Sequence, residues 1–176
     1  SGMMSAGRAG ELGAKTALLE KNNSLGRKLL LTGKGRSNLA KAEFNARELV
    51  KKYGKKGGFL LHPLSVFGVK ETIGFFEKKG LKTRVERGKR IFPQSGQAQD
   101  VLNIFIGYLK SGGVEIMANA EVKEIIRDKG KISKIILKGG KEILAKNYIL
   151  CTGGKSYPKT GSIGEGYQWA KELGHT

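Results

Sequence analysis

The N-terminal segment holds the pattern that most restricts the fold of this chain. Gly2 begins a run of small and polar residues, and an apolar run at 15–20 then ends at Glu20. A glycine at a helix start, with an acid closing a strand 18 residues later, is typical of the second half of a dinucleotide-binding βαβ unit. In such a unit the pyrophosphate lies against amides of the helix N-terminus, and the acid binds the ribose hydroxyls. Ser1 and Gly2 would be the last two positions of the glycine motif.

The strand and the first two glycines that open such a unit would precede Gly2. The chain ends at 174–176, just past a helical pattern, where a doubly wound fold normally returns to another strand. Its 176 residues suffice for one domain with a core but leave little for a separate substrate domain. We therefore expect residues 1–176 to be one partial domain of a larger cofactor protein.

Reactive side chains are scarce in this sequence. It has two histidines, His62 and His175, two aspartates and the single cysteine Cys151, with no H-x-x-x-H or C-x-x-C spacing. Zinc chemistry and Ser-His-Asp hydrolysis are therefore disfavoured, and no metal ligand is assigned. The histidines are expected in a loop and at the terminus, and Cys151 is expected as a buried thiol in an apolar strand. In an enzyme with this inventory, a cofactor would carry the chemistry.

The charge balance is strongly basic, with 33 Lys and Arg against 15 Asp and Glu, a net charge of +18. The basic residues are spread over helix faces and turns, as at 51–56, and are not gathered with aromatics into a stacking platform. We therefore expect solvated surface, with nonspecific polyanion binding at low salt and no specific nucleic-acid partner. The alternative is a noncatalytic basic binding module with nonspecific nucleic-acid affinity.

The sequence says less about the cellular location and the oligomeric state of the protein. No apolar run approaches the roughly 18 residues of a membrane span, so no membrane partner is expected. A single cysteine forms no internal disulfide, which makes a reducing cytoplasm the default. The sequence carries no prediction of oligomeric state.

A glycine-rich basic segment, L-G-R-K-L-L-L-T-G-K-G-R-S-N, occupies 25–38. Its glycines allow the backbone to approach a ligand closely. Lys28 and Arg36 can offset the charge of a pyrophosphate, and Thr32 and Asn38 can donate hydrogen bonds. The segment suits contact with a phosphate or a flavin, although such clusters also form plain solvated loops.

This segment strongly resembles the G-x-K-(apolar)-T-G-x-G-R-C-N motif of a bacterial flavoprotein family, whose members are described as NAD(FAD)-utilising dehydrogenases, aminoacetone oxidases or bile-acid reductases. Two further blocks resemble the family in the same order: R-I-F-P-Q-S at 90–95, followed by Ala98 and Val101, and L-C-T-G-G-K-S-Y-P at 150–158, followed by T-G-S and G-E-G. Ser37 stands where the family usually has cysteine, so no redox role is assigned to it, and Ala40-Lys41 replaces the more typical Thr-Asn.

The resemblance implies an α/β, Rossmann-like FAD/NAD(P)-binding domain with an antiparallel β-meander, lacking its first strand and its C-terminal return. It implies FAD as cofactor, NAD(P)H as a candidate electron donor and a small organic substrate, for an oxidoreductase that is active at full length and inactive as this fragment. No acid–base residue is assigned. The cofactor-binding residues it implies, together with those argued above, are Gly2, Glu20, Lys21, Lys28, Thr32, Gly33, Gly35, Arg36, Asn38, Val122 beside the adenine, Thr152, Gly153 and Gly154.

The hydrophobic pattern predicts the elements between these blocks. Helices are expected at 2–12, 46–53, 65–79 and 97–111, and strands at 15–20, 81–86, 89–92, 114–117, 120–127, 132–137, 142–145 and 148–152. In the helix at 65–79, the packed face would be Val66, Val69, Ile73 and Phe76. Turn residues at 128–131 and 138–141 predict the meander. Ser162 and Glu165 would form a capping box for the last helix, a structural role.

Overall fold

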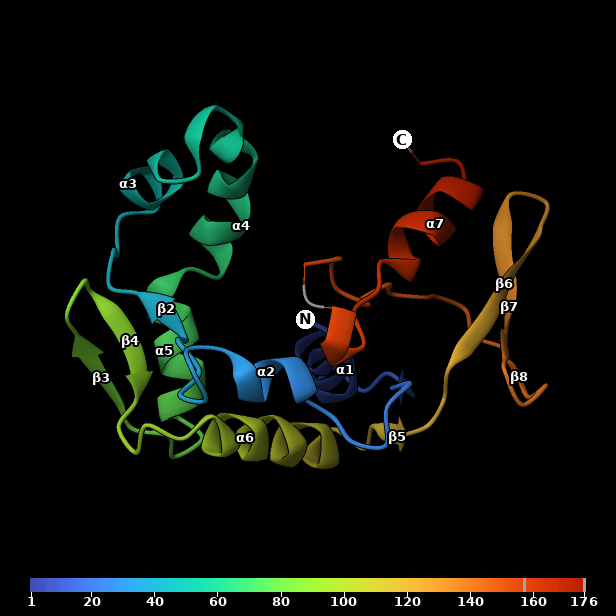
Figure 1. Ribbon diagram of the computed structural model, residues 1–176, viewed down its shortest axis with the longest axis horizontal. Coiled ribbons are helices and arrows are strands. Elements are labelled where there is room, and N and C mark those ends of the chain that lie inside the picture. Colours follow the sequence, from blue (N-terminus) through green and yellow to red (C-terminus); the bar gives the residue numbers. More distant parts are fainter. Residues whose placement is uncertain (157, 176) are drawn as a thin grey trace. The chain divides into compact units, whose positions relative to one another are not determined.

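The computed structural model describes residues 1–156 and 158–175, and Figure 1 labels its helices and strands. Tyr157, which belongs to the third block of the family resemblance, lies outside the described residues. The chain divides into two compact units. The first unit is Ser1–Lys28 with Phe105–Thr176, and the second unit is Leu29–Ile104.

The first unit begins with the predicted helix and parallel strand. Helix α1 spans Gly2–Glu11, and β1 spans Ala17–Leu19. Strand β1 pairs in parallel with β5 (Glu115–Met117), with Leu18 opposite Ile116. The core beneath them is Ala6, Leu109 and Val114. The predicted helix is confirmed with one residue fewer, and the predicted strand is confirmed with three residues where 15–20 was expected.

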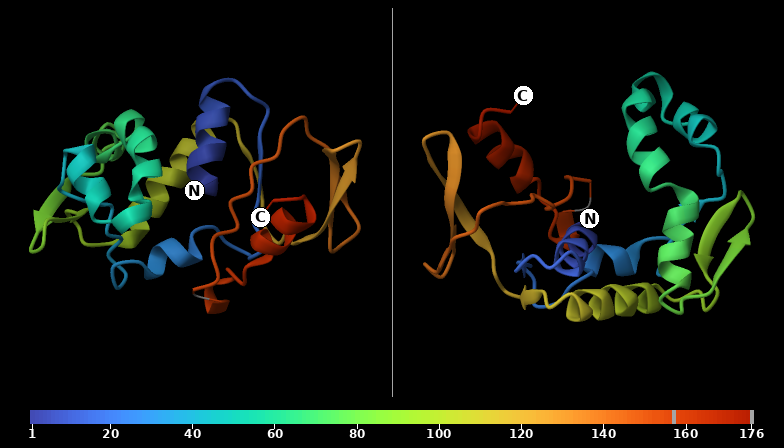
Figure 2. Two further views of the ribbon diagram at one scale, coloured as in Figure 1. Left: turned by 90° about the horizontal axis from the view of Figure 1, so that it is seen from above. Right: turned by 180° about the vertical axis from the view of Figure 1, so that it is seen from behind.

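The predicted antiparallel meander is also confirmed, and Figure 2 shows its long first hairpin. The strands β6 (Val122–Asp128), β7 (Lys131–Leu137) and β8 (Glu142–Ile143) pair in the order β6-β7-β8. The first hairpin turns at Lys129 and Gly130, whose φ values are 47° and 80°. Two successive positive φ values match the right-handed twist of the strands they connect.

Glycines bring α1 close to the part of helix α6 (Ala98–Ser111) that belongs to the first unit, residues 105–111. A Cβ at Gly7 would lie 2.4 Å from Cδ1 of Tyr108, and one at Gly10 would lie 2.3 Å from the carbonyl oxygen of Gly112. The Tyr108 hydroxyl donates to Glu11 at 2.8 Å. Gly7 and Gly10 thus allow α1 to contact α6 and the turn that follows it.

The second unit combines short helices with a small antiparallel sheet. Its helical elements are α3 (Ala46–Lys51), the 3-10 helix η1 (Gly54–Leu60), α4 (Leu61–Val66) and α5 (Val69–Glu77), while α2 (Arg27–Leu31) leads into the unit. The sheet order is β2-β4-β3, from β2 (Ala40–Lys41), β4 (Arg90–Pro93) and β3 (Thr83–Glu86). Leu49, Val69 and Ile91 form its core.

The prediction of one helix at 65–79 is wrong at its start, because the helix is interrupted between α4 and α5. Phe67 is extended, with φ −140° and ψ 77°, and Gly68 is the N-cap of α5. The Glu71 carboxylate accepts the Gly68 N–H at 2.9 Å, which stabilises a new helix start there. Val66 therefore lies outside the packed face and is 65% exposed.

The strand predicted at 148–152 does not form. Among the described residues no strand pairs with this segment, and Ile149 is 69% exposed. An apolar run becomes a strand only where a neighbouring strand takes up its backbone hydrogen bonds. Cys151 is accordingly half-buried rather than buried in a sheet. The histidine prediction also needs correction, since His62 is exposed on α4 rather than in a loop.

The predicted capping box at Ser162 and Glu165 is wrong. Helix α7 spans Glu165–Glu172, so Glu165 is its first residue and Gly164 is the N-cap. Gly164 has φ 92° and no side chain with which to cap. Ser162 is instead buried two residues before the cap, and Glu165 pairs with Lys21.

The close contact at Gly7 predicts a stability difference between two glycines. Gly7→Ala should destabilise the protein, because overpacking against the buried Tyr108 ring costs about 1–3 kcal/mol and exceeds the roughly 0.5–1 kcal/mol that alanine gains in a helix. Gly107→Ala in α6 is the control, since a Cβ there meets open space, and it should stabilise. Urea unfolding measures both. Equal stability of the two variants would contradict the close packing.

Candidate functional site

The N-terminus of α1 lies beside the carboxyl end of β1. A Cβ at Gly2 would lie 3.5 Å from Cδ1 of Leu18 and 3.4 Å from Cβ of Cys151. The first bond within the helix runs from the Ser5 N–H to the Ser1 carbonyl at 2.9 Å, so the preceding amides have no partner inside the helix. Amides at a helix N-terminus, together with the helix dipole, favour an anion.

Glu20 follows β1 directly and is held in place by Asn22. Oε1 of Glu20 accepts from the Asn22 backbone N–H at 2.9 Å and from its Nδ2 at 2.6 Å. The Asn22 Oδ1 in turn accepts from Arg27 at 2.8 Å. Among the described residues no hydrogen bond involves Oε2 of Glu20. A half-buried carboxylate with one oriented oxygen and one available acceptor suits a pair of ribose hydroxyls.

Lys21 forms an ion pair with another residue of the same chain. Its ammonium pairs with the Glu165 carboxylate at the first residue of α7, and both side chains are largely buried. A Cβ at Gly161 would lie 3.2 Å from Cε of Lys21, so the chain before α7 runs over this loop. The pair ties the start of α7 to the end of β1. Cofactor contact by Lys21 stays a prediction.

The turn at 151–154 contributes further predicted residues on the same side of the first unit. Thr152 packs on α7, because its Oγ1 lies 2.3 Å from where a Cβ of Gly166 would be. Gly153 has φ 76°, and a Cβ there would lie 3.9 Å from Nζ of Lys28. A Cβ at Gly154 would lie 3.4 Å from the hydroxyl oxygen of Tyr167. The structure thus brings Gly153 and Lys28 together.

Val122 begins β6 and lies opposite Leu137 of β7. Its side chain is half-buried, while Leu137 is buried. An apolar, partly accessible side chain can form one wall for a planar ring. Its place beside an adenine stays a prediction.

In the second unit, the loop after α2 adopts a left-handed backbone. The φ values are 57° at Gly33, 57° at Lys34, 82° at Gly35 and 55° at Ser37. Gly33 is also sterically required, since a Cβ there would lie 2.9 Å from the Asn38 amide nitrogen. Ser37 is buried. Gly33 and Gly35 thus shape the backbone of this loop, while the close approach to a ligand that was expected of them stays a prediction.

Thr32 and Asn38 already serve the fold of this loop. The Thr32 hydroxyl donates to the Leu29 carbonyl at 2.6 Å. The Asn38 amide, with its nitrogen turned toward the sheet, donates to the carbonyls of Ile91 at 3.2 Å and Ala40 at 2.9 Å. The predicted donors to a cofactor therefore bond to backbone carbonyls here.

Arg36 is fixed by a carboxylate and an aromatic ring. Its guanidinium pairs with Glu86 and lies 4.2 Å from the ring centroid of Phe92. Arg84 donates to the same Glu86 oxygen at 2.9 Å. The hydrogen bond from Arg36 is the main cause that lowers the pKa of Glu86, and the charges of both arginines add to it. Arg36 is thereby oriented and partly neutralised.

Sequence reasoning missed the residues that hold the predicted ones in place, namely Asn22, Glu86, Phe92 and Glu165. The Glu20-x-Asn22 spacing is local and was available as a signal, because an acid accepts readily from an amide two residues on. Glu86 is 50 residues from Arg36, so only the fold brings them together.

The described residues include no group of three side chains suited to a metal ion. In the same part of the chain, no helix has the length and apolar character needed to cross a membrane.

The lowered pKa of Glu86 predicts a pH-dependent stability. A carboxylate with a lowered folded-state pKa stabilises above its ordinary pKa of 4.5, and this stability is lost as the pH falls through the folded-state value. Glu86→Gln should therefore destabilise at neutral pH and have little effect in strong acid, as measured by urea unfolding. In an Arg36→Met background the substitution should matter less. An equal loss at both pH values would argue against the ion pair.

Comparisons with known proteins identify the family of this chain. Residues 1–176 match the family described as HI0933-like protein Rossmann domain. A 3-dehydro-bile acid delta(4,6)-reductase from Clostridium scindens is 35% identical over 164 residues, covering 93% of this chain and 38% of that protein. A ribosomal RNA dihydrouridine synthase from Haemophilus influenzae is 22% identical over 176 residues, covering 99% of this chain and 43% of that protein.

The chain thus spans about two fifths of the length of these relatives. Among solved structures, pqsL, a probable FAD-dependent monooxygenase from Pseudomonas aeruginosa, is 14% identical over 81% of this chain and 36% of that chain, with a TM-score of 0.41. The family match confirms the resemblance and the Rossmann-like α/β fold expected from the sequence. The chain belongs to the HI0933-like Rossmann-domain family.

Proposed function

We propose that this chain is the FAD-binding part of an oxidoreductase. The observation that carries the proposal is the placement of the α1 N-terminus beside the carboxyl end of β1, where Glu20 follows. Helix amides that donate and a strand-end carboxylate that accepts are the groups that a dinucleotide needs for its pyrophosphate and its ribose. The residues present therefore fit the adenylate half of FAD.

In the first unit, the amides that follow Gly2 would bind the pyrophosphate, and Oε2 of Glu20 would accept from the ribose hydroxyls. Asn22 would hold Glu20 in orientation through the other oxygen. Val122 would line the adenine. Further contacts proposed for this unit are those of Lys21, Lys28, Thr152, Gly153 and Gly154.

In the second unit, the loop residues keep their proposed flavin-side role, which rests on the family resemblance. They are Thr32, Gly33, Gly35, Arg36 and Asn38. Arg36 would present a charge that Glu86 and Phe92 orient. When bound, FAD supplies hydride transfer, which the side chains of this chain do not provide.

We further propose that the reaction is reduction of a carbon–carbon double bond conjugated to a carbonyl group. Two relatives, a 3-dehydro-bile acid delta(4,6)-reductase and a ribosomal RNA dihydrouridine synthase, have names that describe the addition of hydrogen to a double bond. The reaction adds a hydride and a proton across the double bond and oxidises NAD(P)H as donor. We favour a small organic molecule as the substrate. We propose that the protein acts in the cytoplasm.

The chain spans 38% of the length of the reductase it resembles. We therefore propose that the chain alone binds cofactor without catalysing the reaction. No acid–base residue is assigned. If no flavin binds, the noncatalytic basic binding module is the remaining alternative.

The ribose assignment predicts that Glu20→Ala weakens FAD binding. Loss of hydrogen bonds to a charged group costs about 1.5–3 kcal/mol, which corresponds to roughly 10- to 100-fold in dissociation constant. Equilibrium dialysis with FAD measures it. Glu124→Ala removes an equal charge from an exposed position on β6 and should leave the affinity unchanged. Unchanged affinity in Glu20→Ala would remove the ribose assignment.

A further inference from the structure

The second unit carries a helical lobe, residues 44–67, that combines positive charge with exposed aromatic rings. The lobe holds α3, η1 and α4. Gly57 of η1 packs against α3, since a Cβ there would lie 2.4 Å from the Val50 carbonyl oxygen. The elements of the lobe therefore form one packed surface rather than a string of turns.

Lysines dominate the junction of α3 and η1. Lys51, Lys52, Lys55 and Lys56 are all exposed within six residues. Only Lys51 has a carboxylate partner among the described residues, Glu48 at 2.6 Å. The second unit as a whole holds 16 Lys and Arg against six Asp and Glu in residues 29–104, so this cluster lies in the more basic part of the chain.

Two aromatic rings stand exposed among these lysines. Tyr53 lies between the two lysine pairs and is 59% exposed, and Phe59 follows three residues after Lys56 at 76% exposure. The sequence pattern at 51–56 predicted no stacking platform, whereas in the structure both rings are exposed close to the lysines in the chain. A ring this accessible, flanked by ammonium groups, can stack on a base while the lysines contact phosphates.

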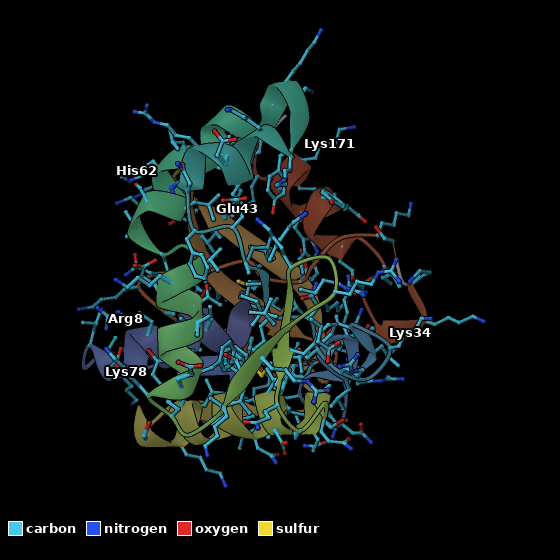
Figure 3. All side chains as sticks on the ribbon, turned by 90° about the vertical axis from the view of Figure 1, so that its left-hand side faces the viewer. Arg8, Lys34, Glu43, His62, Lys78 and Lys171 are labelled. Carbon is cyan, nitrogen blue, oxygen red and sulfur yellow. The ribbon has the colours of Figure 1, made fainter. Side chains whose placement is uncertain are left out.

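A shallow depression of about 680 Å³ lies between α3 and α4 of the same lobe. It is lined by Asn45, Ala46, Arg47, Leu61, His62 and Ser65. Figure 3 labels His62 on α4. Among the lining residues, Asn45, Arg47, His62 and Ser65 carry polar side chains. Such groups can hydrogen-bond base edges and 2′-hydroxyls.

We propose that this lobe binds single-stranded RNA, with phosphates on the lysines, bases on Tyr53 and Phe59, and polar contacts in the depression. A duplex fits less well, because its bases are stacked inside and cannot reach the rings. An apolar protein segment fits less well too, since it would bury the ammonium groups of Lys52, Lys55 and Lys56, for which the described residues offer no carboxylate partner. The proposal goes beyond the flavin chemistry and does not rest on it.

The first test is fluorescence anisotropy with a labelled single-stranded RNA of about twelve nucleotides, in the absence of flavin, at salt around 0.15 M and below. Lys55→Ala/Lys56→Ala should weaken binding about tenfold or more and reduce the salt slope by about 1.4, from two lost phosphate contacts. The matched control is Lys141→Ala/Lys146→Ala, which removes the same charge from exposed positions outside the lobe and should change little.

The second test separates stacking from charge. Tyr53→Ala and Phe59→Ala should each weaken binding about tenfold with no change in salt slope, because a stacked base is lost and a phosphate contact is not. Tyr167→Ala, at an exposed ring in the first unit, is the control and should be neutral. Matching circular dichroism spectra would show that each variant folds.

Several results would overturn the proposal: no binding by the unmodified protein near 0.15 M salt, equal binding of duplex and single strand, equal loss in both lysine pairs, or no effect of the aromatic variants. A deoxy strand of the same sequence should bind more weakly, and equal binding would overturn the RNA assignment. Flavin binding is measured separately, so its failure leaves this test unaffected.

Discussion

Close approach of α1 to its neighbours is the contact on which the first unit depends. Gly2 lets the helix start lie against Leu18 of β1, and Gly7 lets the helix body lie against the buried Tyr108 ring. With no side chain between them, the unpaired amides of α1 come to the carboxyl end of β1, where Glu20 follows. A larger residue at Gly7 would move the helix and with it the N-terminus proposed to bind the pyrophosphate.

The proposed binding residues are held by others that make no proposed contact. Asn22 orients Glu20 through hydrogen bonds, and Glu165 forms an ion pair with Lys21. Glu86 and Phe92 fix the guanidinium of Arg36. Such partners limit the rotamers of long charged side chains, so less conformational entropy is lost when a ligand binds. The second unit adds a loop whose left-handed residues fix its backbone.

Local patterns in the sequence predicted the elements that are determined by residues close together in the chain. The apolar spacing of Val101, Leu102 and Leu109 predicted α6, and the Asp-Lys-Gly turn predicted the first hairpin of the meander. The prediction of a strand at 148–152 was wrong, because a strand needs a neighbouring strand to pair with and an apolar run does not specify one. Glu20 was predicted from its spacing to Gly2, whereas Glu86 could not be, because it meets Arg36 only through the paired strands β3 and β4.

The most direct test of the account compares FAD with FMN in equilibrium dialysis against the purified protein. Helix amides and Glu20 would hold the pyrophosphate and the adenylate ribose, and FMN lacks the adenylate half. The account predicts that FAD binds at least about a hundredfold more tightly than FMN, the equivalent of roughly 2.8 kcal/mol, and that ADP competes with FAD. Equal affinity for FMN, or no competition by ADP, would contradict it.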